Sequence, residues 1–272
     1  MSDKELGSRS STPGSQDPED YLAESLSLLG VEAVPSDNSL SYGPLKLSVA
    51  SKLGKANTLL ADQFFSPSLV FGELIERKRI VLEGLTVLEL GAGAALPSLL
   101  LSVIPAAPSL VTITDHPDPS IFMNLQNNVR RNANLRSGSC KVSCLPYIWG
   151  EDPEPLLKEA RRLNPNQQGK GYDAMILSDL LYFDSSHRDL IESLTLLLRR
   201  HPSSVAYVGA GIYTSEATCS SFFSLAEEAG LAKEEGQVEP DWLGTMVIGR
   251  LSREDLAKHK ANSRWWTLRW MS

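Results

Sequence analysis

The feature that most constrains the fold is an alternation of short β-rich runs with helical segments from Thr86 onward. The runs are almost continuously apolar, which is typical of strands buried on both faces. Such strands, separated by helices, predict a parallel sheet covered on both sides, and so a doubly wound α/β domain. The runs are 86–90, 110–115, 141–149, 173–183, 204–212 and 246–255, and the helical segments are 97–104, 121–133, 153–163, 187–200 and 215–230.

The rest of the chain adds a tail to this domain. Residues 1–20 are rich in Ser, Pro, Gly and acids, so we expect them to form a disordered tail. We assign residues 21–272 to a single domain, since a chain of 272 residues can build one sizeable core. Leucines between residues 21 and 30 are spaced for a short helix, and weak alternation over 45–60 indicates strands.

Composition excludes several classes of function. A net charge of −7 argues against a general nucleic-acid binder, because phosphate binding favours a basic protein field. No stretch approaches the ~20 apolar residues of a membrane span, and the N-terminus lacks the apolar core of a signal peptide. Three cysteines indicate a reducing compartment and hence the cytoplasm. The four histidines are scattered, so we expect no metal site.

Ligands of doubly wound sheets bind at the carboxyl ends of the strands, and the first such end is glycine-rich. Gly91, Ala92 and Gly93 follow the run 86–90 and let a ligand approach the backbone closely. The third glycine of the dinucleotide fingerprint is replaced by Leu96, so the loop lacks a residue used for pyrophosphate. A simple tight turn is the alternative.

The next two strand ends carry an acid and an indole. Asp115 stands 24 residues after Gly91, where an acid accepts hydrogen bonds from ribose hydroxyls. The alternative is a helix N-cap. Trp149 ends the third run and offers a flat face on which a base can stack. The alternative there is a core tryptophan.

The fourth run ends in the sequence SDLLYF, which contains Ser178, Asp179 and Tyr182. Burying an aspartate at the end of an apolar strand is costly unless the carboxylate is paired or functional. The alternative role for Asp179 is a cap on a backbone amide. A glycine loop, a ribose acid, a stacking ring and this polar end together suit adenosine without a pyrophosphate, which S-adenosylmethionine (SAM) provides.

These segments, ELGAGAALPSLL, TDHPDP, PYIWG and SDLLYF, resemble the seven-stranded SAM-dependent methyltransferases with a Rossmann-like sheet. Within them they resemble the fungal family once called nicotinamide N-methyltransferase-like, which includes protein N-terminal and lysine methyltransferases of elongation factor 1-alpha. The resemblance covers about residues 64–230. It implies that cofactor contacts come from Phe65, Gly91, Ala92, Gly93, Asp115, Trp149 and Ser178, and that Asp179 and Tyr182 match an Asp-x-x-Tyr motif of related lysine methyltransferases.

The resulting hypothesis is a SAM-dependent protein N-methyltransferase that acts on a lysine or an N-terminal amine. The implied substrate is elongation factor 1-alpha. The negative charge of the enzyme would attract a basic protein surface of this kind. The alternative is a small-molecule enzyme acting on nicotinamide or a similar pyridine. We expect a monomer. The C-terminal sequence RWWTLRWMS is expected to pack back onto the core, with an interface or a membrane surface as alternatives.

Overall fold

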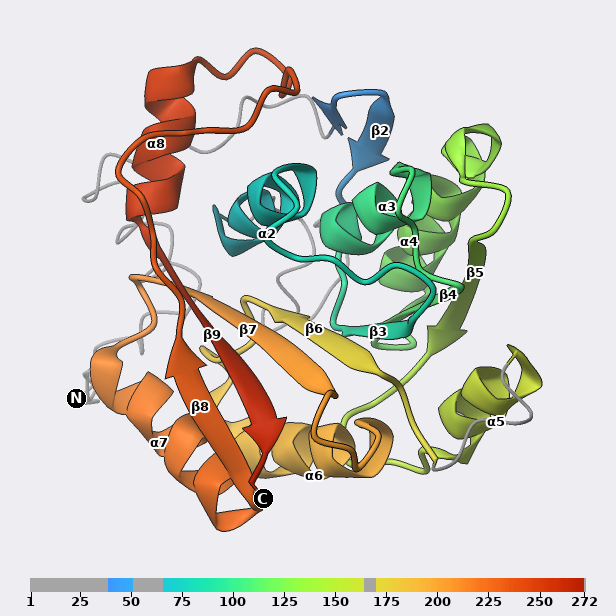
Figure 1. Ribbon diagram of the computed structural model, residues 1–272, viewed down its shortest axis with the longest axis vertical. Coiled ribbons are helices and arrows are strands. Elements are labelled where there is room, and N and C mark those ends of the chain that lie inside the picture. The colour runs from blue at the N-terminus through green and yellow to red at the C-terminus, as the bar shows by residue number, and fades with distance from the viewer. Residues whose placement is uncertain (1–38, 51–65, 164–169, 272) are drawn as a thin grey trace, which may run out of the picture.

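The computed structural model describes residues 39–50, 66–163 and 170–271, and its main element is a seven-stranded sheet with helices on both faces (Figure 1). The strand order is β5-β4-β3-β6-β7-β9-β8. Strands β3 to β7 pair in parallel, and β9 is antiparallel to both of its neighbours. The doubly wound, mostly parallel sheet predicted from the sequence is therefore confirmed.

The described elements include a two-stranded hairpin outside the main sheet. The strands are β1 (Ser39–Tyr42), β2 (Leu45–Ser48), β3 (Thr86–Leu90), β4 (Leu110–Asp115), β5 (Lys141–Pro146), β6 (Ala174–Ser178), β7 (Val205–Gly211), β8 (Leu231–Glu235) and β9 (Ser263–Trp270). The α-helices are α2 (Ser66–Glu76), α3 (Leu96–Val103), α4 (Pro119–Arg131), α5 (Glu154–Leu163), α6 (His187–Leu197), α7 (Glu216–Glu228) and α8 (Arg253–Ala261).

Two apolar clusters hold the layers together. Strands β3, β4 and β7 are buried at every position, which explains their continuous apolar sequences. One cluster joins one face of the sheet to α2, α3 and α4, through residues such as Leu69, Leu99 and Leu125. The other joins the opposite face to α5, α6 and α7, through residues such as Leu156 and Phe222. Figure 1 shows these two sets of helices on opposite sides of the sheet.

The strand order reverses at β3, which lies between β4 and β6. The connection from β3 runs to β4 on one side, and the chain later returns to place β6 on the other. In sheets of this kind a crevice opens beyond the carboxyl ends of the strands at such a switch point. The loops after β5, β4, β3 and β6 are therefore the ones that form the site.

The C-terminal part of the sheet differs from the sequence-based expectation. Residues 246–255 were predicted to form an edge strand, which is wrong. Within them Ile248 makes an isolated bridge to Tyr42, and Arg253 begins α8. The sixth and seventh strands are instead β8 and β9. Strand β9 contains most of the tryptophan-rich C-terminal sequence and buries Trp266, so its predicted packing onto the core is confirmed.

The hairpin β1–β2 is attached to the sheet through the buried Asn128 of α4. Its Oδ1 accepts the Ser48 N–H at 2.9 Å, and its Nδ2 donates to the Ser48 carbonyl at 2.8 Å. The same Nδ2 lies 3.2 Å from the carbonyl of Ala94, in the glycine-rich loop. One amide side chain thus joins three segments. The expected tail over 1–20, the helix over 21–30 and the end of the 45–60 segment lie outside the described residues.

Among the helices in the described ranges, none has the length and apolar character needed to cross a membrane. Cys140, Cys144 and Cys219 are all free.

Candidate functional site

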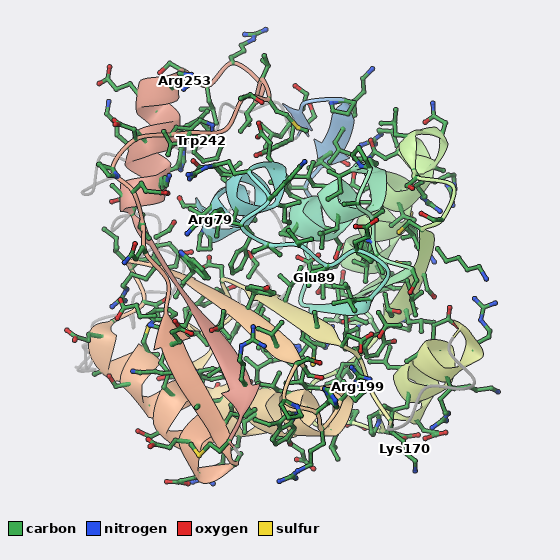
Figure 2. All side chains as sticks on the ribbon, in the orientation of Figure 1. Arg79, Glu89, Lys170, Arg199, Trp242 and Arg253 are labelled. Carbon is green, nitrogen blue, oxygen red and sulfur yellow. The ribbon has the colours of Figure 1, made fainter. Side chains whose placement is uncertain are left out.

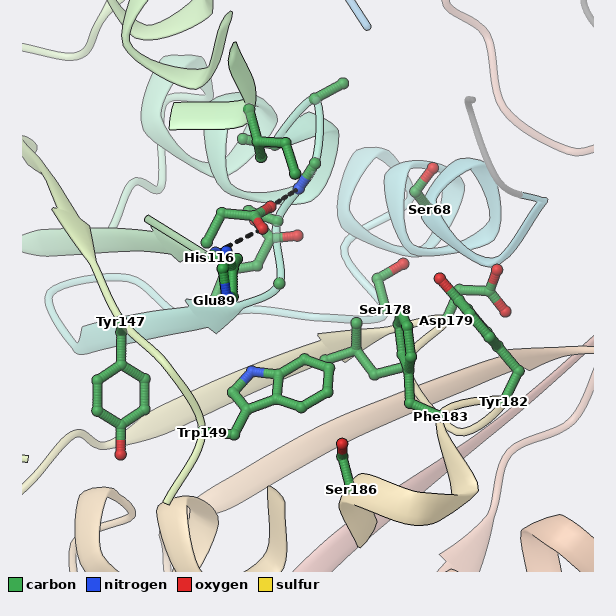
Figure 3. Close-up of a pocket in the computed structure, with 18 of the residues that line it drawn as sticks. Ser68, Glu89, His116, Tyr147, Trp149, Ser178, Asp179, Tyr182, Phe183 and Ser186 are labelled. Atoms are coloured by element: carbon green, nitrogen blue, oxygen red, sulfur yellow. Dashed lines mark hydrogen bonds between the residues drawn. The ribbon is translucent and has the colours of Figure 1, made fainter. Parts of the chain in front are cut away.

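The loops after β3, β4, β5 and β6 surround a cavity of about 480 Å³ (Figure 3). Eight candidates named from the sequence line it together: Gly91, Ala92, Gly93, Asp115, Trp149, Ser178, Asp179 and Tyr182. The ninth, Phe65, lies outside the described residues. Residues from the ends of four adjacent strands, β5, β4, β3 and β6, thus converge at the switch point, as the topology requires.

The glycine loop turns sharply because two of its residues adopt left-handed backbone conformations. Gly91 and Gly93 both have φ of 54°. A Cβ at Gly91 would lie 2.7 Å from Leu180 Cδ2, so the loop packs too closely there for a side chain. A Cβ at Gly93 would meet no atom within 4 Å. Because Gly93 also lines the cavity, a side chain at that position would enter the open space.

Asp115 ties the end of β4 to the glycine loop. Its Oδ2 accepts the Gly93 N–H at 2.6 Å, and its Oδ1 accepts the His116 N–H at 2.7 Å. The carboxylate is 9% exposed and faces the cavity. The alternative role as a helix cap is wrong, since the N-cap of α4 is Asp118. Asp115 therefore shapes the loop and presents an anionic group beside it.

Glu89 is a cavity residue that the sequence analysis did not name as a site residue. It is 0% exposed on β3, and its Oε2 accepts the Ser98 N–H at 3.2 Å. Its Oε1 is buried and has no hydrogen-bond partner among the described residues, and the same holds for Oγ of Ser178. Burial raises the pKa of Glu89 to about 8, against the opposing effect of the Ser98 hydrogen bonds. Glu89 lies near the middle of the molecule in Figure 2.

Trp149 forms one wall of the cavity. It is half-buried, and its ring makes an edge contact with Phe183 at 5.5 Å between centroids and an interplanar angle of 73°. Figure 3 shows the indole between the Tyr147 and Phe183 sides of the site. Trp149 also packs on the apolar cluster of the α5–α7 face, as the alternative of a core tryptophan expects, and its role in stacking a base stays a prediction.

Asp179 is held tightly just beyond the end of β6. It is 2% exposed and has φ of 64°, a left-handed conformation that is uncommon for a residue with a side chain. Its Oδ1 accepts the Gly211 N–H at 3.0 Å, and its Oδ2 accepts the hydroxyl of Tyr213. Burial raises the pKa of Asp179 to about 7, and the Gly211 hydrogen bond opposes this rise. The alternative role of Asp179, a cap on a backbone amide, is confirmed, and the residue also lines the cavity.

Tyr182, Phe183 and Tyr213 form an aromatic group that contacts Asp179 through the Tyr213 hydroxyl. The Tyr182 ring lies 4.1 Å from Phe183 and 6.5 Å from Tyr213, measured between centroids. The electron-rich faces of such rings attract cationic groups. Tyr213, like Glu89, was missed from the sequence, although it follows the fifth β-rich run at the edge where ligands bind. The arrangement can therefore receive an amine beside a carboxylate.

No group of three or more His, Cys, Asp or Glu side chains that could hold a metal ion occurs in the ranges that the structure describes. The cavity instead offers buried acceptor oxygens, a glycine loop and aromatic faces.

Comparison with known proteins gives a family match over most of the domain. A family model described as lysine methyltransferase matches residues 45–229. A protein N-terminal and lysine N-methyltransferase efm7 from Schizosaccharomyces pombe is 31% identical over 166 residues, which cover 61% of each chain. A protein of the same name from Gibberella zeae is 32% identical over 183 residues, which cover 64% of this chain and 67% of that one.

Solved structures give a weaker likeness. A methyltransferase from Pyrococcus furiosus is 12% identical, with a TM-score of 0.49 over 93% of this chain and 98% of that chain. Among the sequence relatives, this chain spans 61% of the Schizosaccharomyces pombe protein, which is less than two thirds of that protein's length.

Proposed function

Because this chain belongs to the lysine methyltransferase family, whose model matches residues 45–229, we propose that it transfers a methyl group from SAM to an amine of a protein substrate. The observation that carries this proposal is the cavity itself. It combines a glycine loop open to a ligand at Gly93 with two buried oxygens that have no partner among the described residues, on Glu89 and Ser178.

The residues present fit SAM. Its α-ammonium would pair with Oε1 of Glu89, which is buried and otherwise unsatisfied. Its ribose hydroxyls would donate to Asp115, since each carboxylate oxygen can accept more than one hydrogen bond. Trp149 supplies a flat face for adenine, and Oγ of Ser178 supplies a further polar contact. Phe65 belongs to this proposed set through the family resemblance alone.

When bound, SAM supplies a methyl group activated by a sulfonium. The chain must then hold an unprotonated amine in line with that methyl group, so that the N–C bond forms as the S–C bond breaks. Asp179 would accept a hydrogen bond from the amine, orient its lone pair and receive or relay the proton that the product loses. The rings of Tyr182 and Phe183 would surround the cationic product.

The substrate class follows from the charges around the cavity. Asp189 lines it, and Asp184 and Glu216 are exposed on the segments that follow β6 and β7. Together with the net charge of −7, these acids favour a basic protein surface as the partner. We include in the proposal elongation factor 1-alpha as the substrate, a monomeric enzyme and a cytoplasmic location.

The test compares methyl incorporation from tritiated SAM into purified elongation factor 1-alpha and into nicotinamide. We expect labelled protein, and a rate that falls at high salt more than SAM affinity does, because surface docking is screened. Asp179→Ala should lower turnover and leave SAM affinity nearly unchanged. Formation of N-methylnicotinamide without labelled protein would overturn the proposal in favour of the small-molecule alternative.

A further inference from the structure

Tyr213 reaches back from beyond β7 to the carboxylate of Asp179. The phenol lies two residues after the last residue of β7, and its hydroxyl donates to Oδ2 of Asp179. The N–H of Gly211 donates to Oδ1 of the same carboxylate at 3.0 Å. The N–H of Asp179 in turn donates to the carbonyl of Gly209 at 2.9 Å. All three partners come from the end of β7 and the turn after it.

Gly211 makes this contact possible through its missing side chain. A Cβ at that position would lie 2.2 Å from Cε1 and 2.4 Å from Cζ of the Tyr213 ring. Real Cβ atoms do not approach a ring so closely, so the phenol can lie over Gly211 only because no side chain is there. Gly211 thus supplies one hydrogen bond to Asp179 and the room for the residue that supplies the other.

The hydrogen bonds also hold Asp179 in its unusual backbone conformation. A φ of 64° in a residue with a Cβ persists when the surroundings over-determine it. Here the backbone N–H and both carboxylate oxygens of Asp179 are fixed by the β7 end. Strain of this kind collects at functional sites, where it sets the direction of a side chain.

On the premise that Asp179 receives the substrate amine, as proposed above, we propose that Tyr213 is a positioning residue that orients the Asp179 carboxylate and stabilises its charged form. A hydrogen bond to a carboxylate favours ionisation, whereas burial disfavours it. The phenol also forms part of the aromatic surface beside Tyr182, with ring centroids 6.5 Å apart.

Three other titratable groups near Asp179 have contacts of their own and do not make the hydrogen bond that Tyr213 donates to its carboxylate. Tyr182 follows β6 and stacks against Phe183. Cys219 lies on α7 with its thiol pKa raised by burial. Arg264 on β9 donates to the Thr214 carbonyl at 2.7 Å and lies 3.6 Å from Cys219 Sγ. Its guanidinium is therefore engaged by Thr214 and Cys219.

Three variants test the proposal through the pH profile of methyl transfer to purified elongation factor 1-alpha at saturating SAM. Tyr213→Phe should shift the acidic limb of kcat upward by about one pH unit, the change expected for one lost hydrogen bond to a charged group. Gly211→Ala should give the same shift although it removes no hydroxyl, because its Cβ displaces the ring. Tyr207→Phe, a hydroxyl deletion earlier on β7, is the matched control and should leave the profile in place.

A second measurement decides the inference without any activity. Carbon-13 NMR titration of the Asp179 carboxyl, assigned by the signal lost in Asp179→Asn, should show the same upward shift in Tyr213→Phe and Gly211→Ala. Coincident titration curves in wild type and Tyr213→Phe would overturn the role of Tyr213. An enzyme that labels no protein would refute the proposed function instead, and the NMR titration would still decide the role of Tyr213.

Discussion

Glu89 should release a proton when SAM binds. With a pKa of about 8 in the ligand-free protein, about 0.9 of the Glu89 side chains carry a proton at pH 7. Pairing with the α-ammonium of SAM requires the carboxylate form, because a protonated acid next to a buried cation leaves the charge uncompensated. Binding at pH 7 should therefore release about 0.9 proton per site.

The same linkage sets the pH dependence of affinity. Since the raised pKa keeps Glu89 protonated at low pH, affinity should rise about ninefold between pH 6 and pH 7. The α-ammonium of the ligand stays mostly protonated over this range, because α-amines titrate near pH 7.7–8.0. Above about pH 8 the affinity should fall, because Glu89 is then already ionised while the α-amine of the ligand loses its proton.

Isothermal titration calorimetry in phosphate and in Tris measures the released proton, since these buffers differ in ionisation enthalpy. Two controls isolate Glu89. The ligand 5′-methylthioadenosine lacks the α-ammonium and should release no proton. Glu89→Gln should weaken SAM binding and remove its pH dependence, while affinity for 5′-methylthioadenosine stays the same. Equal SAM binding enthalpies in both buffers, with a flat affinity from pH 6 to 7, would refute the assignment of Glu89 to the ammonium.

Three further predictions concern cofactor binding and stability. Asp115→Ala should weaken SAM affinity by about 1.5–3 kcal/mol per lost charge-assisted hydrogen bond, and unchanged affinity in a folded variant would contradict its ribose role. Gly93→Val should abolish SAM binding. Gly84 also has positive φ and open space around an added Cβ, but it lies outside the cavity lining, so Gly84→Val should lower stability alone. Asn128→Ala should lower the free energy of unfolding by about 2 kcal/mol in urea denaturation, because it leaves the Ser48 N–H unpaired and the Ser48 carbonyl with Asn124 alone; an unchanged midpoint would show that water replaces the amide.

The inner strands could be predicted because burial on both faces demands apolar residues at successive positions, as in β3 and β4. Strand β8 escaped prediction for the opposite reason. Four of its five residues are exposed, so its sequence LAKEE carries no burial signal. In β9 the tryptophans and arginines resemble an interface segment. The indole nitrogen of Trp270 in fact donates to the carbonyl of Arg199 at 2.9 Å, and Trp266 packs on Phe223.

The prediction of a strand over residues 246–255 was wrong because the apolar residues of this segment lie in a loop before α8. Ile248 is buried by its bridge to the hairpin, while Val247 is 74% exposed. An apolar run therefore predicted a strand where the segment makes only an isolated bridge among the described residues. The local sequence does not show that Ile248 pairs with Tyr42 of the distant hairpin.

The site was largely predictable since strand ends of a doubly wound sheet must meet at one edge. That rule places Asp115 and Asp179 at the same cavity, as the structure confirms. It does not find Glu89, which lies within β3 rather than at its end. A charged residue inside a fully buried strand was the available signal. Tyr213 was accessible to the same rule at β7, but its contact with Asp179 depends on a ring folding back over Gly211, which spacing alone does not reveal.

During synthesis, β8 leaves the ribosome before β9, although β9 lies between β8 and β7 in the finished sheet. Until residue 263 and those after it emerge, the edge of β7 keeps unpaired backbone groups, and β8 has no neighbour in the sheet. Gly209 and Gly211, whose backbone groups hold Asp179, lie on that edge opposite Trp265 and Ser263, and they lack this neighbour until β9 begins to emerge. A nascent chain stalled between β8 and β9 would contain the five parallel strands with this wall of the cavity unsupported, so the site is completed only after β9 has been made.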